Sequence, residues 1–477
     1  MTDGTSGPNG TSGTDATNGS NGTNGTNGTN GTGPVLATAH GLLRGTLEGP
    51  VAAFRGIPYA ASPVGALRFA APSPQPGWQG IRDAVRPGPA APQGPSRLEA
   101  VMGPREPDWD EDGCLTLNVW TPRQTPAAAT DAPRPVLLWF HGGGFSSGSG
   151  GWDWYDGARL AALGDIVVVT ANYRVGPLGY LYLPEFGADN LGCRDQGAAL
   201  RWVAENIAAF GGDPAAITVG GQSAGAYSAL ALALDPATGG AVRRVIAQSG
   251  PWGMRPQDPA EAAETAAAYL RLLGIDPRQA GSAPGASGWE ELRALPVRQL
   301  LDTYRRLAAD RAGSGDPNPP MYPVLGGAGL PQPMLPAVAA GALGGKDLLL
   351  GTTTDEMTGF GLHGPVGETV THRFFHAGAT ELAEHRAAQG TPAYVYRFDR
   401  RPTPDELGLG ATHCAELPFL FGTFDAYPAA PMLGTVGAAD RALGEAFGRA
   451  LAAFTATGAP GGDWTPYRTA ADVQRFA

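Results

Sequence analysis

Cysteine is scarce in this chain of 477 residues. Its three cysteines are Cys114, Cys193 and Cys414, and their separations do not match the spacing of a metal-binding cysteine motif. An odd number of scattered cysteines is typical of free thiols in a reducing compartment. The sequence therefore predicts a cytoplasmic protein without a disulfide framework and without a metal site.

Positive charge and long apolar runs are also scarce. The chain has 33 basic and 44 acidic residues, which gives a net charge of −11, and Lys346 is its one lysine. This balance argues against a nucleic-acid partner and against binding to an anionic membrane surface. No apolar run approaches the ~20 residues of a membrane-spanning helix, and no signal-peptide pattern begins the chain. We therefore expect a partner that is a small molecule.

Residues 1–34 contain almost no apolar side chains. They consist mainly of Gly, Thr, Asn, Ser and Asp, with Asn-Gly-Thr triplets repeated between residues 21 and 32. Such a segment cannot bury enough apolar surface to offset the entropy lost on ordering. We predict a disordered low-complexity tail over 1–34 and one folded domain over 35–477.

Apolar segments alternate with helix-like segments along the rest of the chain. Strands are predicted at residues 136–140, 166–172, 217–220, 244–248, 348–351 and 394–398, with an antiparallel hairpin around 51–56. A helix is predicted over 195–210 with Asp195 as its N-cap, another over 440–455, and helical cap segments over 255–345. This order predicts an α/β fold with a mostly parallel central sheet covered by helices on both faces.

The most informative motif is Gly221-Gln222-Ser223-Ala224-Gly225. It lies between a short apolar run and a helix-like segment rich in small residues. A serine on such a tight strand-to-helix turn is exposed and strained, and the flanking glycines relieve the crowding. The motif predicts that Ser223 is a nucleophile and that the backbone N–H of Ala224 stabilises an oxyanion.

A second motif, His141-Gly142-Gly143-Gly144-Phe145, directly follows the predicted strand 136–140. Glycines let backbone N–H groups approach a substrate without an intervening Cβ, so this loop predicts the other side of an oxyanion hole. The alternative is an ordinary glycine-rich surface loop, which the downstream serine motif disfavours.

A nucleophilic serine needs a histidine base and an acid, in the chain order serine, acid, histidine. The downstream histidines are His363, His372, His376, His385 and His413. His413 lies in a loop before an apolar stretch, whereas His372, His376 and His385 fall in a charged helix-like segment and are expected at the surface. The acidic pair Asp355-Glu356 follows the predicted strand 348–351, at the edge where a catalytic cleft would lie.

Several further segments resemble the type-B carboxylesterase family. They are residues 54–60 with 63–69, 111–120, 190–214 and 248–250, and the resemblance covers roughly residues 36–470. It implies an α/β-hydrolase fold and a serine carboxylesterase that needs no cofactor. Carried over position by position, it implies Ser223 as nucleophile, Glu356 as acid and His413 as base. It also implies Gly143, Gly144 and Ala224 as oxyanion donors, and Ser249 as a partner of the acid.

The resemblance also indicates a substrate class. Residues 221–223, 248–254 and 413–419 are similar to those of bacterial enzymes that cleave aryl esters and aryl carbamates. Expected pocket residues are Phe145, Gln222, Trp252, Met357 and Phe419. Gln222 stands where the family commonly has glutamate, which disfavours cationic substrates. Carbamate hydrolysis, acyl transfer and lactonisation on the same triad remain alternatives, and a non-catalytic binding protein is a further one.

Overall fold

The computed structural model describes residue 1 and residues 33–105, 108–123, 132–277, 287–314, 316, 318–427 and 429–477. The predicted tail over 1–34 lies almost entirely outside the described residues. Within them, no helix is both long enough and apolar enough to cross a membrane.

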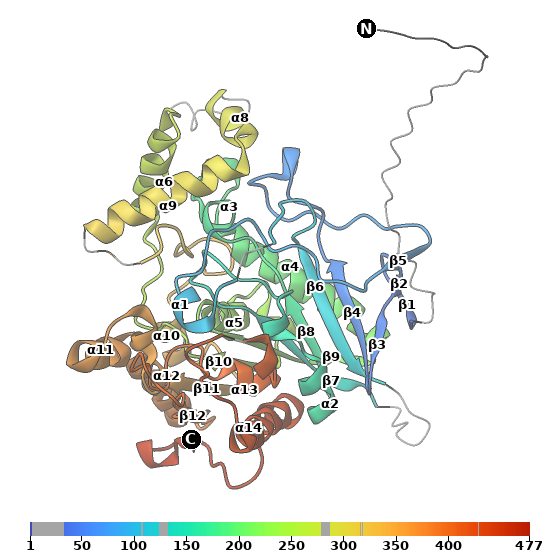
Figure 1. Ribbon diagram of the computed structural model, residues 1–477, viewed down its shortest axis with the longest axis vertical. Coiled ribbons are helices and arrows are strands. Elements are labelled where there is room, and N and C mark those ends of the chain that lie inside the picture. Colours follow the sequence, from blue (N-terminus) through green and yellow to red (C-terminus); the bar gives the residue numbers. More distant parts are fainter. Residues whose placement is uncertain are drawn as a thin grey trace. The chain divides into compact units, whose positions relative to one another are not determined.

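A ten-stranded sheet forms the centre of the part from residue 33 onward (Figure 1). Seven adjacent strands of this sheet run parallel to one another: β13, β12, β11, β10, β9, β7 and β8. The remaining three, β6, β4 and β3, pair antiparallel with their neighbours. In spatial order they are β13 (Gln474–Phe476), β12 (Tyr394–Phe398), β11 (Asp347–Thr353), β10 (Arg244–Gln248), β9 (Gly212–Gln222), β7 (Arg134–Phe140), β8 (Val167–Ala171), β6 (Thr116–Pro122), β4 (Val51–Pro58) and β3 (Thr46–Glu48).

Both faces of this sheet are buried, as the side chains of β7 illustrate. Val136, Leu138 and Phe140 belong to one apolar cluster, while Leu137 and Trp139 belong to the other. Successive strand residues point to opposite faces, so a strand covered on both sides has apolar residues throughout. This explains the unbroken apolar runs of the sequence and confirms the predicted α/β class.

Helices cover the two faces in separate groups. α2, α13 and α14 contribute to the cluster that contains Trp139, and α4, α5 and α12 contribute to the cluster that contains Phe140. The α-helices are α1 (Glu99–Met102), α2 (Ala158–Gly164), α3 (Gly176–Tyr180), α4 (Leu191–Asn206), α5 (Ala224–Leu234), α6 (Pro259–Leu272), α8 (Ser287–Ala294), α9 (Val297–Gly313), α10 (Met334–Ala339), α11 (Gly364–Thr371), α12 (Ala377–Ala388), α13 (Leu417–Phe421) and α14 (Ala438–Thr457).

The predicted cap segment over 255–345 contains α6, α8, α9 and α10. Figure 1 shows α6, α8 and α9 grouped at the top of the view. The predicted helix over 440–455 is α14, which ends at Gly458 with a positive φ of 85°.

Asp195 is not an N-cap, which corrects the sequence prediction. α4 begins four residues earlier, at Leu191, so Asp195 lies inside the helix. Its carboxylate is fully buried and accepts hydrogen bonds from Nε and Nη2 of Arg174, each at 2.7 Å. A long-range ion pair, rather than a capping bond, explains the aspartate at this position.

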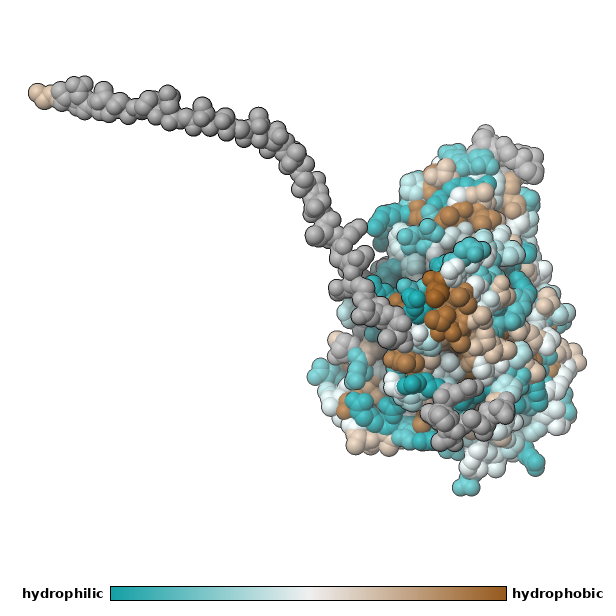
Figure 2. All heavy atoms as spheres, turned by 90° about the vertical axis from the view of Figure 1, so that its right-hand side faces the viewer, coloured by the Kyte–Doolittle hydropathy of each residue, from teal (hydrophilic) through white to brown (hydrophobic). Residues whose placement is uncertain are grey.

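The N-terminal part of the described chain forms two hairpins instead of one. β3 and β4 pair antiparallel and join the edge of the large sheet, as predicted around 51–56. β1 (Val35–Thr38) and β2 (Gly41–Arg44) form a second hairpin, which β5 (Ile81–Asp83) extends into a small separate sheet. Figure 2 shows apolar side chains gathered on one face, and large exposed apolar residues of these strands are Val35, Leu42, Leu47 and Ile81.

Candidate active site

Ser223 lies at the sharp turn between β9 and α5, with φ 57° and ψ −122°. The turn requires both flanking glycines. A Cβ on Gly221 would lie 2.3 Å from the carbonyl carbon of Gly225, and one on Gly225 would lie 2.0 Å from the carbonyl oxygen of Phe140. The Ser223 backbone N–H donates to the Gln248 carbonyl at 2.8 Å, which fixes the turn against β10. The predicted elbow is therefore present, and its serine is partly exposed.

The glycine loop after β7 also needs its glycines. Gly143 has φ 118°, and a Cβ there would lie 2.1 Å from the carbonyl oxygen of Ser147. Gly144 has φ 59°. Within the described chain, the backbone N–H groups of Gly143, Gly144 and Ala224 have no intramolecular acceptor. Backbone N–H groups without an acceptor near a partly exposed serine can bind an oxyanion.

Glu356 and His413 meet behind the elbow. Glu356 begins a short 3₁₀ turn just after β11, and its Oε2 lies 2.5 Å from Nδ1 of His413. The other carboxylate oxygen accepts the Thr353 backbone N–H at 2.8 Å. Burial alone would raise the pKa of Glu356, but the neighbouring His413 and hydrogen bonds from His413 and Ser249 hold it below its usual value. Glu356 is therefore an ionised acid partner for the imidazole.

Asp355, the other member of the acidic pair, joins the loops that carry Glu356 and His413. Its backbone N–H donates to the Ala411 carbonyl at 2.8 Å, and its Oδ2 accepts the Ala411 N–H at 2.9 Å. Arg401 approaches the same oxygen at 3.4 Å. The pairing of these loops places His413 opposite Glu356, so geometry agrees with the preference for Glu356 over Asp355.

Gln222 contacts the imidazole on its other side. Nε2 of Gln222 lies 3.2 Å from Nε2 of His413, and the Gln222 oxygen lies 3.4 Å from Sγ of Cys414. Among the described residues, this amide rather than the Ser223 hydroxyl is the hydrogen-bond partner of His413 Nε2. The rings of Phe360 and Phe375 contact the His413 ring, with centroid distances of 5.4 and 5.1 Å.

Sequence reasoning missed a second buried carboxyl group, that of Glu416. Its side chain is fully buried, and its Oε1 lies 3.5 Å from Oγ of Ser249. Burial and the negative charge of Glu356 raise the pKa of Glu416 to about 8, so the group is mostly protonated at neutral pH. Ser249 thus lies between the two carboxyl groups, and it was expected beside the acid. The position of Glu416 three residues after His413 was the only available signal.

The structure places the expected pocket residues in different surroundings. Trp252 stacks on Tyr227 with a centroid distance of 6.5 Å, and half-buried Met357 follows Glu356 directly. Phe419 was expected in the pocket, but its ring is buried against Phe398 and Phe424 in the core beneath α14, which corrects that prediction.

The ring of Phe145, also expected in the pocket, is fully buried against Tyr180 and Tyr227. It anchors the glycine loop instead of lining an open pocket. His376, which was expected at the surface, is half-buried and takes part in hydrogen bonds. Its Nε2 lies 2.9 Å from the Thr353 carbonyl, and burial, together with the nearby charge of Arg397, lowers its pKa to about 4.

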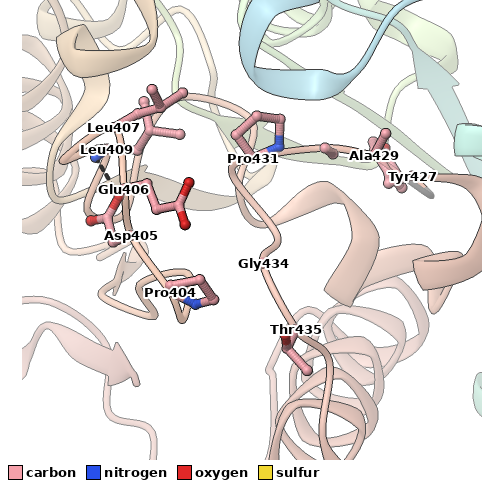
Figure 3. Close-up of a pocket in the computed structure, with 11 residues that line it drawn as sticks. Pro404, Asp405, Glu406, Leu407, Leu409, Tyr427, Ala429, Pro431, Gly434 and Thr435 are labelled. Atoms are coloured by element: carbon pink, nitrogen blue, oxygen red, sulfur yellow. Dashed lines mark hydrogen bonds between the residues drawn. The ribbon is translucent and has the colours of Figure 1, made fainter.

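Two cavities are candidate ligand-binding sites. One, of about 520 Å³, lies between residues 404–409 on one side and residues 427 and 429–435 on the other (Figure 3), and none of Ser223, Glu356 and His413 is among its lining residues. The other, of about 220 Å³, lies between the glycine loop and α9 and includes Ser146 in its wall. The second cavity therefore adjoins the oxyanion loop.

Comparison with known proteins gives consistent matches. A model of the carboxylesterase family matches residues 32–366 and 361–476. The chain is 35% identical over 443 residues to phenmedipham hydrolase of Pseudarthrobacter oxydans, covering 84% of this chain and 85% of that protein. It is 36% identical over 427 residues to para-nitrobenzyl esterase of Bacillus subtilis, covering 82% and 83%. The structure of a thermophilic PNB esterase superposes with a TM-score of 0.79 at 32% identity, covering 92% and 94%, which confirms the α/β-hydrolase fold.

Proposed function

Because this chain belongs to the carboxylesterase family, we propose that it hydrolyses carboxylic esters through an acyl-enzyme formed on Ser223. The observation that carries the proposal is the 2.5 Å contact between Glu356 and His413 behind a serine held at a strained turn. The proposed catalytic domain extends over 35–477.

In the proposed reaction, His413 Nε2 takes the Ser223 proton while the hydroxyl oxygen attacks the ester carbonyl. Glu356 keeps the proton of the neutral imidazole on Nδ1 and stabilises the positive charge that develops on the ring. The backbone N–H groups of Gly143, Gly144 and Ala224 bind the oxyanion. His413 then protonates the leaving alcohol, and water hydrolyses the acyl-enzyme by the same route in reverse.

The proposed substrates are small esters, including aryl esters. A second candidate is a carbamate, which the similarity to a phenmedipham hydrolase supports. Both reactions use the same nucleophile and oxyanion donors, so one site can serve both.

The direct test is hydrolysis of 4-nitrophenyl esters from acetyl to decanoyl by the wild type and by Ser223→Ala. We expect activity in the wild type, at least a ~10³-fold loss in the variant, and covalent labelling of Ser223 by a fluorophosphonate probe. A folded wild type that neither turns over any ester nor takes up the label would overturn the proposal and favour a binding protein.

A further inference from the structure

Arg97 lies beside the proposed oxyanion hole on a loop that precedes α1. A Cβ built on Gly144 would lie 2.9 Å from Nη2 of Arg97, so the guanidinium directly adjoins one of the proposed oxyanion donors. The guanidinium carbon also lies 5.9 Å from the ring centroid of Phe360, and Phe360 contacts His413. Arg97 is exposed although its neighbour Leu98 is buried.

The loop that carries Arg97 is fixed to the glycine loop. The buried amide of Gln93 donates to the Gly148 carbonyl at 2.8 Å and accepts the Gly148 N–H at 2.7 Å. On the other side of Arg97, the buried side chain of Leu98 packs into the core. These two contacts hold the backbone around Arg97 against the glycine loop. The guanidinium of Arg97 is therefore held beside that loop by the fold.

Arg97 also lines the cavity of about 220 Å³ between the glycine loop and α9. Its wall is mainly apolar, with Leu301, Pro319 and the alanines of α9, and it carries a second cation, Arg305. Of these two arginines, Arg97 is the one that adjoins Gly144 of the glycine loop, and Arg305 forms a surface ion pair with Asp302. A ligand that fits this wall has an apolar body and an anionic group.

We propose that Arg97 forms an anion-recognising subsite beside the oxyanion hole, which selects esters carrying a carboxylate on the part that extends toward α9. The inference rests on the proposed ester hydrolysis at Ser223. Arginine is suited to this role because its planar guanidinium can donate two parallel hydrogen bonds to a carboxylate. The net charge of −11 disfavours anionic substrates in general, so a preference for them would have to arise locally.

The test uses two pairs of substrates that differ only in charge. One pair is 4-carboxyphenyl and 4-carbamoylphenyl butanoate, with the charge on the leaving group. The other is the 4-nitrophenyl monoester of adipic acid and its terminal amide, with the charge on the acyl chain. In at least one pair, we expect the wild type to show about tenfold lower KM for the anionic member, the ratio given by one charge-assisted hydrogen bond.

Arg97→Gln should abolish this KM ratio and leave kcat/KM for the neutral esters within about threefold of wild type. Arg305→Gln, in the same wall, is the matched control and should keep the ratio. The ratio should also shrink at high salt, because partly exposed charges are screened. Equal KM values within both pairs for the wild type, or ratios that Arg97→Gln leaves unchanged, would overturn the proposal.

Binding to an inactive enzyme separates this proposal from the proposed function. Calorimetry on Ser223→Ala should show tighter binding of 4-carboxyphenyl butanoate than of its carboxamide, and the added Arg97→Gln change should remove the difference. If the wild type hydrolyses no ester while this binding difference is present, the ester hydrolysis fails and the anion subsite stands. If esters are hydrolysed and neither the binding difference nor a KM ratio is found, the subsite fails.

Discussion

The side-chain nitrogen of Gln222 lies 3.2 Å from Nε2 of His413, the atom that has to take the Ser223 proton in the proposed reaction. Nδ1 of the same ring faces Glu356, so in the neutral imidazole Nδ1 carries the proton and Nε2 accepts. The Gln222 amide therefore donates to the lone pair that the reaction needs. Substrate binding has to break this contact or turn the amide.

Gln222→Glu should move the acidic limb of the pH–rate profile upward by about one pH unit. A carboxylate this close to the imidazole stabilises its protonated form, which cannot act as base. The activity that depends on neutral His413 is then lost at a higher pH as the solution is acidified. The measurement is kcat/KM for a neutral 4-nitrophenyl ester between pH 5 and 9.

Gln222→Met is the control for this experiment, because it has a similar length and no charge. Its acidic limb should coincide with that of the wild type, whatever its absolute rate. If the acidic limbs of the Gln222→Glu and Gln222→Met profiles coincide, a charge at position 222 does not affect the protonation of His413, and the interpretation of the contact is wrong.

Glu416 should make the folded protein less stable as the pH rises. Its folded-state pKa is about 8, raised by burial and by Glu356, whereas an unfolded glutamate has a pKa of about 4.3. Between these values the unfolded chain loses the proton and the folded chain keeps it. The contribution of Glu416 to stability is therefore fully present below about pH 4 and falls progressively until about pH 8, by up to about 5 kcal/mol in total.

Glu416→Gln removes this dependence while keeping the size of the side chain. We expect its free energy of unfolding, relative to wild type, to increase steadily from pH 5 to pH 8 when both are unfolded in urea. Glu205→Gln, at an exposed position of α4, should show no such trend. A difference between wild type and Glu416→Gln that stays constant across these pH values would contradict a raised pKa at Glu416.

The features that the sequence predicted correctly are those imposed by local backbone geometry. The elbow at Ser223 and the loop at Gly143 need glycines at fixed neighbouring positions, and these glycines form motifs that can be recognised in the sequence. The strands of the parallel sheet are visible because both of their faces are buried, which leaves continuous apolar runs.

The features that the sequence did not reveal depend on partners far along the chain. Asp195 looked like a helix cap because its partner, Arg174, is 21 residues away. Glu416 and Arg97 are residues whose significance comes from what surrounds them: the carboxylate of Glu356 in one case and the glycine loop in the other. Phe419 was misplaced because the face that a short helix buries cannot be read from its neighbours in sequence.

Gly225→Ala should destabilise the fold strongly, although it improves helix propensity. Alanine in place of glycine favours a helix by about 1 kcal/mol, but the new methyl group would lie 2.0 Å from the Phe140 carbonyl oxygen. A backbone atom cannot move aside cheaply, so we expect a net loss of about 3 kcal/mol or an insoluble protein.

Gly240→Ala is the matched substitution, because a Cβ at Gly240 meets nothing within 4 Å and the residue is exposed. Its free energy of unfolding should stay within about 0.5 kcal/mol of wild type. Urea unfolding of both variants tests the difference, and a well-folded Gly225→Ala with wild-type stability would show that the elbow can widen.

The ion pair between Arg174 and Asp195 should be the most sensitive charged pair of the core. Both side chains are almost fully buried, and the guanidinium also donates to the Ala70 carbonyl at 2.8 Å. Arg174→Met leaves Asp195 charged and buried without a cationic partner, keeping only the backbone N–H of residue 174 as a donor at 3.1 Å, and removing one partner of a buried pair typically costs ~3–5 kcal/mol. Arg44→Met breaks the exposed pair with Asp83 and should cost no more than about 1 kcal/mol.

The double variant Arg174→Met/Asp195→Leu decides whether the cost comes from the orphaned charge or from lost packing. Removing both charges takes away the desolvation penalty together with the attraction, so most of the stability should return. The free energies of unfolding of the wild type, Arg174→Met, Asp195→Leu and the double variant together form a double-mutant cycle. A double variant no more stable than Arg174→Met would locate the loss in the hydrogen bond to Ala70 and in the packing around residue 174.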